Sequence, residues 1–396
     1  MKRMTKTRVR TAAACLGLAA GVLLAGPATA QTKGAGNELV VGTIQDLSGP
    51  LAAYGKSVRD GMNLRVAEAN EQGGVNGRRL KLLIEDSGYD PRRAVLAAQR
   101  LVKQEKAFVM LGVLGTAPAN AAFPVLEQSN VINLFPMALA REMYEPLHKL
   151  KFAVFSSYVE QMSRAVPSLY REKKATRACT LHQDDEFGLE VMRGAEQGLK
   201  SIDVALAERT TYKRGATDFS SQVARLKQAG CDFVVLGTVI RETVGAIAEA
   251  RKVDFHPTFV ASVAAYTDLI PKLGGKGMDG LYVTMASLFP YEDDASQALR
   301  FWAGKYKTAY GEAPNVFSTY GYMLMDRLVT ALQKAGANPT TESLVKALES
   351  LSVPSDLFGT PAMRWSANNH LGSTATRLSQ LQGGRWKLVL DYDQMR

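Results

Sequence analysis

The chain has 396 residues, a formal net charge of +10 at pH 7 and 46% hydrophobic residues. Five of the positive charges lie within the first ten residues, so the rest of the chain carries +5, and no basic stripe with interleaved aromatic residues follows. This composition gives little support to nucleic-acid binding. The length exceeds the roughly 250–300 residues at which a single core stops growing, so we expect two lobes.

Residues 1–30 have the pattern of a secretory signal peptide. Basic residues precede an apolar run from Ala12 to Ala25, and the small residues Ala28 and Ala30 form a cleavage signal. The run is shorter than the ~20 apolar residues of a membrane-spanning helix, and no later segment reaches that length. We expect an exported protein that is cleaved after Ala30.

The next part of the chain alternates strands with helices. A strand over Glu38–Ile44 precedes a helix whose apolar residues recur every three or four positions from Val58 to Ala69. A strand over Leu80–Ile84 and a helix over Pro91–Lys103 come next. This alternation predicts a parallel, doubly wound sheet, because each helix carries the chain back to the end of the sheet at which the previous strand began.

The stretch Phe108–Leu139 is one β-α-β unit. Its apolar runs and turn residues predict strand 108–111, helix 117–128 and strand 131–135. Ligands of parallel sheets bind where strands end and helices begin, because helix N-termini present free N–H groups to anions. We therefore expect Gly115, Thr116 and Ala117 to hold a carboxylate. The alternative is that Thr116 only caps the helix.

The alternating pattern starts again after Phe152. The expected helices are 161–173, 188–200, 219–228 and 242–252, and the expected strands are 177–182, 204–211, 232–237, 258–262 and 280–284. Helices are then expected around 295–310, 318–334 and 342–351, followed by strands 375–381 and 386–391. Gly383 and Gly384 predict a hairpin between these strands. Two similar α/β halves imply a cleft between them.

Cys179 and Cys231 are the two cysteines that follow the expected signal peptide. In an oxidising compartment they could form a disulfide, which requires Cα atoms within about 7 Å of each other. Buried cysteines also serve as small hydrophobic residues. We expect two free thiols, with the disulfide as the alternative.

No catalytic constellation is evident in the sequence. The histidines His148, His182, His256 and His370 are scattered, and neither a nucleophile elbow, a metalloprotease motif nor a Walker A motif occurs. The acidic run 184–186 could bind a metal ion, but three consecutive acids rarely converge on one ion, so we expect a solvated loop. We expect no catalytic residue, no cofactor and no metal.

Several stretches together resemble one family. They are Val41–Val95, the Gly115-Thr116 turn, His182–Gly188, Ala216–Gly237 and Gly277–Thr284. In order and spacing they are similar to the Leu/Ile/Val-binding family of periplasmic solute-binding proteins of ABC importers, over essentially the whole chain after the signal. The resemblance implies a type I periplasmic binding fold of class α/β, with two doubly wound parallel-sheet lobes joined by a three-segment hinge.

The resemblance also implies an organisation and a role. The hinge would lie near 156–157, 284–285 and 354–361, so that lobe one comprises 38–156 plus 285–355 and lobe two 157–284 plus 356–396. The protein would be a periplasmic monomer that delivers a small-molecule ligand to the permease and ATPase subunits of an importer. It would be neither an enzyme nor a nucleic-acid-binding protein. A ligand sensor that docks on a receptor is the alternative.

Amino-acid-binding members of the family imply a site in the cleft. Thr116 and the position of Leu139 would bind the ligand carboxylate, and Tyr54 would cover the ligand side chain. The full set of expected ligand-binding residues is Tyr54, Gly115, Thr116, Ala117, Met137, Leu139, Phe187, Val239, Arg241 and Val263. Arg241 would be either a bidentate partner of the carboxylate or a solvated surface residue.

Two positions depart from the family's amino-acid-binding pattern. Val263 stands where an acid pairs with the α-ammonium, and Leu139 stands where a Thr donates to the carboxylate. A buried, unpaired ammonium would cost several kcal/mol, so an aromatic or other hydrophobic carboxylate fits better than an α-amino acid. The acids that could replace the missing partner are Asp184, Asp185 and Glu242. We expect leucine, isoleucine and valine to bind weakly or not at all; a small branched-chain amino acid, the ordinary ligand of the family, is the alternative.

Overall fold

The computed structural model describes residues 38–392 and residue 394. The expected signal peptide and its cleavage site lie outside the described residues. Within this range, no helix combines the length and the apolar character that a membrane crossing requires.

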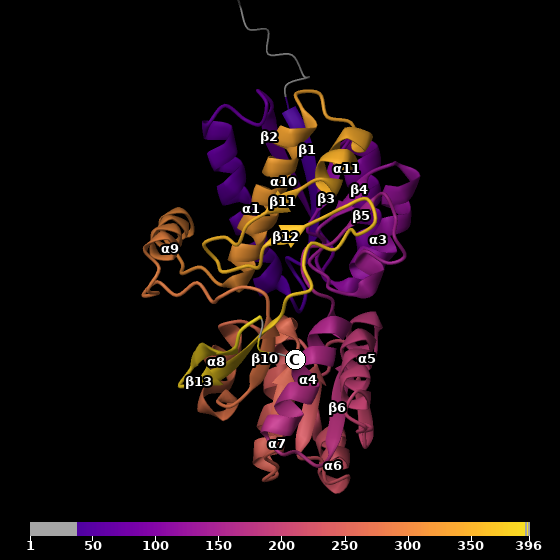
Figure 1. Cartoon of the computed structure of the whole chain (residues 1–396), viewed down its shortest axis with the longest axis vertical. Helices are drawn as coiled ribbons and strands as arrows, with labels where there is room; N and C mark the ends of the chain where they lie inside the picture. Colours follow the sequence, from indigo (N-terminus) through magenta and orange to yellow (C-terminus); the bar gives the residue numbers. More distant parts are fainter. Residues whose placement is uncertain (1–37, 393, 395–396) are drawn as a thin grey trace, which may run out of the picture. The chain divides into compact units, whose positions relative to one another are not determined.

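Lobe one is built on a five-stranded parallel sheet (Figure 1) with the strand order β2-β1-β3-β4-β5. The strands are β1 (Glu38–Gln45), β2 (Arg79–Asp86), β3 (Val109–Leu111), β4 (Ile132–Leu134) and β5 (Lys151–Phe152). The connecting helices are α1 (Ala52–Glu71), α2 (Pro91–Gln99) and α3 (Thr116–Gln128). Ile44, Met110 and Leu126 belong to the core between the sheet and the α2–α3 pair. The parallel, doubly wound arrangement is confirmed for this lobe.

Lobe two contains a seven-stranded sheet with the order β14-β13-β10-β9-β8-β6-β7. Its strands are β6 (Ala178–Gln183), β7 (Glu208–Tyr212), β8 (Phe233–Gly237), β9 (Thr258–Ala261), β10 (Tyr282–Met285), β13 (Arg377–Gln382) and β14 (Arg385–Leu390). Its helices are α4 (Tyr158–Glu172), α5 (Glu186–Lys200), α6 (Ser220–Gln228), α7 (Ile240–Lys252) and α8 (Leu269–Gly274). The strands from β10 to β7 are parallel, whereas the predicted hairpin β13–β14 forms an antiparallel edge.

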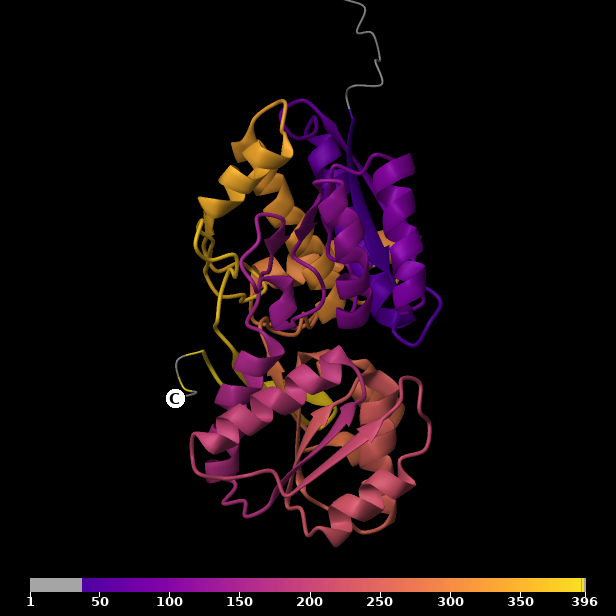
Figure 2. The ribbon, with the colours of Figure 1, turned by 90° about the vertical axis from the view of Figure 1, so that its right-hand side faces the viewer.

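The late helices return to lobe one. They are α9 (Gln297–Tyr310), α10 (Val316–Ala335) and α11 (Thr341–Glu349), followed by the two-stranded pair β11 (Ser352–Val353) and β12 (Met363–Arg364). α10 packs against α1, so helices lie on both sides of the first sheet (Figure 2). A Cβ on Gly61 would lie 2.0 Å from the carbonyl oxygen of Ser318, which shows how closely the two helix backbones approach. The chain therefore passes between the two lobes three times, after β5, after β10 and before β13.

Some element boundaries differ from those that the sequence predicts. The helix expected over 91–103 ends as α2 at Gln99 and continues as one π-helical segment, η1 (Arg100–Gln104). The strand expected from 204 begins only at Glu208. α4 begins three residues earlier than expected, because Ser157 and Glu160 form a capping box. That Ser-x-x-Glu spacing is legible in the sequence.

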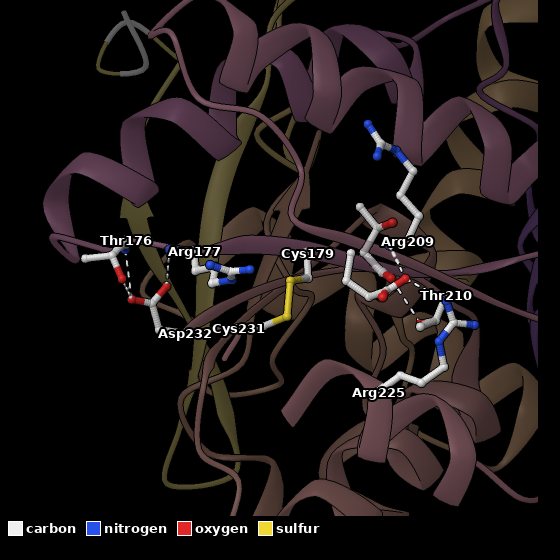
Figure 3. Close-up of a disulfide and its surroundings, with 10 residues drawn as sticks. Thr176, Arg177, Cys179, Arg209, Thr210, Arg225, Cys231 and Asp232 are labelled. Carbon is white, nitrogen blue, oxygen red and sulfur yellow. Dashed lines mark hydrogen bonds and ion pairs between the residues drawn. A yellow bond between two sulfur atoms is a disulfide. The ribbon is translucent and has the colours of Figure 1, made fainter. Parts of the chain in front are cut away.

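The prediction of two free thiols is wrong, because Cys179 and Cys231 form a disulfide with their Cα atoms 6.0 Å apart (Figure 3). Cys179 lies on β6, and Cys231 lies just before β8, the parallel neighbour of β6. The carboxylate of Asp232 accepts hydrogen bonds from the backbone N–H groups of Thr176 and Arg177, both at 2.8 Å. The start of β8 is thus held beside the start of β6, a proximity that spacing along the chain does not reveal.

Candidate functional site

An apolar cavity lies between residues of the two lobes at the carboxyl ends of the lobe-one strands. About 700 Å³ of space lies between its lining atoms, a volume that includes open solvent. None of the described residues that line it carries a charged side chain. Any ligand held here must therefore be recognised by apolar contacts, hydroxyl groups and backbone dipoles.

Eight of the ten expected ligand-binding residues line this cavity. They are Tyr54, Gly115, Thr116, Met137, Leu139, Phe187, Val239 and Val263. Ala117 is buried in the first turn of α3 and is not part of the lining. Arg241 is exposed on α7, as the solvated alternative predicted. The cavity thus lacks the guanidinium that the bidentate interpretation required.

The sequence reasoning missed most of the aromatic wall. The additional lining residues are Leu51, Tyr89, Leu114, Pro136, Val154, Phe155, Tyr158, Ala264, Phe317, Tyr320 and Leu324. They come from the loops after β1, β2, β3, β4 and β9, from the first crossing between the lobes, and from α4 and α10. Phe317 and Tyr320 share one face of α10 at helical spacing, but the same spacing occurs at many core positions. No signal in the sequence separates them from ordinary core residues.

The N-terminus of α3 supplies the polar end of the cavity. Gly115 is the N-cap residue with a φ of 94°, and Thr116 is the first helical residue, so the alternative in which Thr116 caps the helix is wrong. The Thr116 hydroxyl is buried and makes no well-formed hydrogen bond among residues 38–392, although the Tyr158 side chain lies close enough to interact with it. In the same part of the chain, the N–H groups of Thr116 and Ala117 donate to no backbone carbonyl. Free donors and the positive end of the helix dipole therefore meet at one point.

Tyrosine hydroxyls form the remaining polar groups of the wall. The ring of Tyr54 stacks on Phe317 with centroids 3.6 Å apart, and its hydroxyl donates to the carbonyl oxygen of Ala264 in lobe two at 2.6 Å. The rings of Tyr158 and Phe187 meet edge to face, with their centroids 5.0 Å apart. Burial raises the pKa of both tyrosines, so both stay neutral and act as hydrogen-bond donors rather than as charges.

None of the three acids that could replace the missing ammonium partner lines the cavity. Asp184 is exposed and pairs with Lys213. Asp185 caps α5 by accepting from the N–H of Gly188 at 3.2 Å. Glu242 is buried in the first turn of α7, behind the wall. A ligand ammonium would therefore find no carboxylate at the surface of the cavity.

We expect the Glu242→Gln variant to be more stable than the parent protein at pH 7. Burial raises the pKa of Glu242 in the folded state above its ordinary value of 4.5. Ionisation of this carboxyl therefore destabilises the folded protein at pH values above the pKa of the unfolded state. Below that pKa the destabilisation is absent. The variant should have the higher melting temperature at pH 7 and the same melting temperature at pH 4. A lower melting temperature at pH 7 would show that the ionised carboxylate stabilises the fold.

Two α/β lobes with an apolar cavity between them define a class of proteins that hold a small molecule in a cleft. Residues 38–385 match the family model described as periplasmic binding protein. The chain therefore belongs to the periplasmic binding protein family, which implies an extracytoplasmic location and a substrate-binding role.

Three similar proteins give this assignment detail. The Leu/Ile/Val-binding protein of Escherichia coli K12 is 26% identical over 247 residues, which are 62% of this chain and 67% of the relative. A fatty acid ABC transporter substrate-binding protein from Thermomonospora curvata superposes with a TM-score of 0.81 at 21% identity, over 90% of this chain and 92% of that one. An ABC transporter solute-binding protein from R. palustris in complex with benzoate superposes with a TM-score of 0.79 at 19% identity, over 90% of this chain and 96% of that one. At these identities the structural likeness shows the fold alone.

Proposed function

We propose that the protein is the substrate-binding component of an ABC importer and that it captures a hydrophobic or aromatic monocarboxylate between its lobes. The observation that carries this proposal is the cavity itself. It has no charged side chain among its described lining residues, yet it contains a buried Thr116 hydroxyl without a well-formed hydrogen bond at a helix N-terminus.

The carboxylate would bind at the start of α3. The free N–H groups of Thr116 and Ala117, the Thr116 hydroxyl and the helix dipole all favour an anion there. The third helical residue, Pro118, has no N–H group. The first three positions of α3 therefore supply two backbone donors, from Thr116 and Ala117. One singly charged group satisfies this set, whereas a second charge would find no partner in the apolar wall.

The rest of the ligand would lie among the aromatic side chains. Phe187, Tyr158 and Tyr54 offer ring faces and edges, which suit a ring or an alkyl chain. Val263 and Leu139 add no polar group. The fatty acid name of one structural neighbour and the benzoate complex of another support this class of ligand.

Lobe closure is the proposed mechanism. Ligand contacts shared between lobes stabilise only the arrangement in which both lobes reach the ligand. The three passages of the chain between lobes would act as the hinge, near 156–157, 284–285 and 354–361. The mature protein would be a periplasmic monomer, cleaved after Ala30, that presents its ligand to permease and ATPase subunits.

A thermal-shift panel tests the ligand class. Benzoate and other aromatic or aliphatic monocarboxylates should raise the melting temperature, whereas leucine, isoleucine and valine should raise it little. An acid at 100 times its Kd adds about 2.7 kcal/mol, which such a panel detects. Benzamide and phenylalanine are the matched controls, since one lacks the carboxylate and the other adds an ammonium.

The opposite pattern would overturn the proposal. A clear shift with leucine and none with any monocarboxylate would return the protein to the amino-acid specificity of the E. coli relative. Glu242 would then be the first residue to test as the ammonium partner. In that case Glu242→Gln should abolish the leucine shift.

A further inference from the structure

Tyr89 adopts a backbone conformation that a bulky residue rarely takes. It lies in the loop between β2 and α2 with a φ of 60°, in the left-handed region. Such a conformation is energetically unfavourable for a bulky residue and persists only where surrounding contacts hold it. The side chain is buried and lines the ligand cavity.

From lobe one, the ring of Tyr89 presses against the start of α3. A Cβ on Gly115 would lie 2.4 Å from the Cε2 atom of Tyr89, so only glycine at position 115 lets the ring lie there. The ring therefore covers the same helix N-terminus at which the carboxylate is proposed to bind.

From lobe two, one cluster of side chains holds Tyr89. The Nη1 atom of Arg214 donates to the carbonyl oxygen of Tyr89 at 2.8 Å, and the guanidinium lies 4.5 Å from the ring centroid. Arg214 is itself held by Asp185, with Nη2 2.9 Å from the carboxylate. The side-chain amide of Gln183 reaches the Tyr89 hydroxyl at 3.4 Å. The backbone, the ring and the hydroxyl of one lobe-one residue are thus all contacted by lobe two.

We propose that Tyr89 and Arg214 form a latch between the lobes, which favours lobe closure and slows the release of a bound ligand. Separation of the lobes would break the Arg214 contacts and leave the strained Tyr89 backbone without the interactions that offset its cost. It would also uncover the N-terminus of α3. The effect of the latch on lobe closure is independent of the proposed function. Only the effect of the latch on ligand release rests on that function.

The first experiment needs no ligand. Small-angle scattering of the ligand-free protein compares the parent chain with Arg214→Ala. The variant should have the larger radius of gyration, because loss of the latch shifts the population towards separated lobes. The matched control is Arg225→Ala, which removes a surface ion pair with Glu208 within lobe two and should leave the radius unchanged.

The second experiment uses benzoate as the probe in stopped-flow measurements. Arg214→Ala should release benzoate about tenfold faster while its association rate changes little, since changes at an interface act mainly on dissociation. Tyr89→Phe keeps the ring and should change release much less. If Arg214→Ala does not fold, Arg214→Lys replaces it, because lysine keeps the charge but lacks the forked donors.

The outcomes separate the latch from the proposed ligand class. An unchanged radius together with unchanged benzoate release would overturn the latch and leave the proposed function standing. An enlarged radius in a protein that binds no monocarboxylate would support the latch and overturn the proposed function.

Discussion

Replacing both Cys179 and Cys231 by alanine should lower the free energy of unfolding by about 4 kcal/mol, on the chain-entropy account of disulfides. The two residues are 52 positions apart, and the bond restricts the unfolded chain over that whole loop. The sulfur atoms are buried, so the bond is protected in the native state. Urea unfolding followed by circular dichroism measures the loss.

The double variant is the appropriate test, because a single substitution leaves a buried free thiol. Parent protein that is unfolded, reduced and refolded in reducing buffer is the matched control and should lose the same stability. Equal urea midpoints for the oxidised protein and the double variant would contradict the prediction. The same comparison shows whether the fold needs an oxidising compartment, as export predicts.

Thr116→Val should weaken the binding of benzoate by about 1–3 kcal/mol, which is roughly a 5- to 150-fold rise in Kd. Valine keeps the shape of threonine but removes the hydroxyl, which would hydrogen-bond a charged carboxylate. The ligand-free protein should lose little stability, because the hydroxyl makes no well-formed hydrogen bond with any described residue. Calorimetric titration with benzoate and a melting curve without it give the two numbers.

Thr308→Val is the control for this substitution. Thr308 is exposed on α9 and its hydroxyl donates only to the carbonyl of Gly304 within that helix. Its loss should leave the affinity unchanged. If Thr116→Val bound benzoate as tightly as the parent protein, the carboxylate would have to lie elsewhere in the cavity.

The local sequence determined the alternation of strands and helices and the place of the polar end of the cavity. Strand and helix periods are properties of neighbouring residues, so the βαβ units were predicted to within a few residues. Gly115 and Thr116 were identified because strand ends and helix starts are the points at which parallel sheets bind ligands. The resemblance to a known family added the lobe-two positions Phe187, Val239 and Val263.

Only the tertiary structure decided which distant residues meet. The cysteines form a bond because β6 and β8 are neighbours in the sheet, and a sequence separation of 52 does not reveal that order. Tyr89 and Arg214 meet because two lobes face each other. Such contacts depend on how strands are ordered and how lobes pack, which are non-local properties, whereas sequence patterns report the local preferences of the chain.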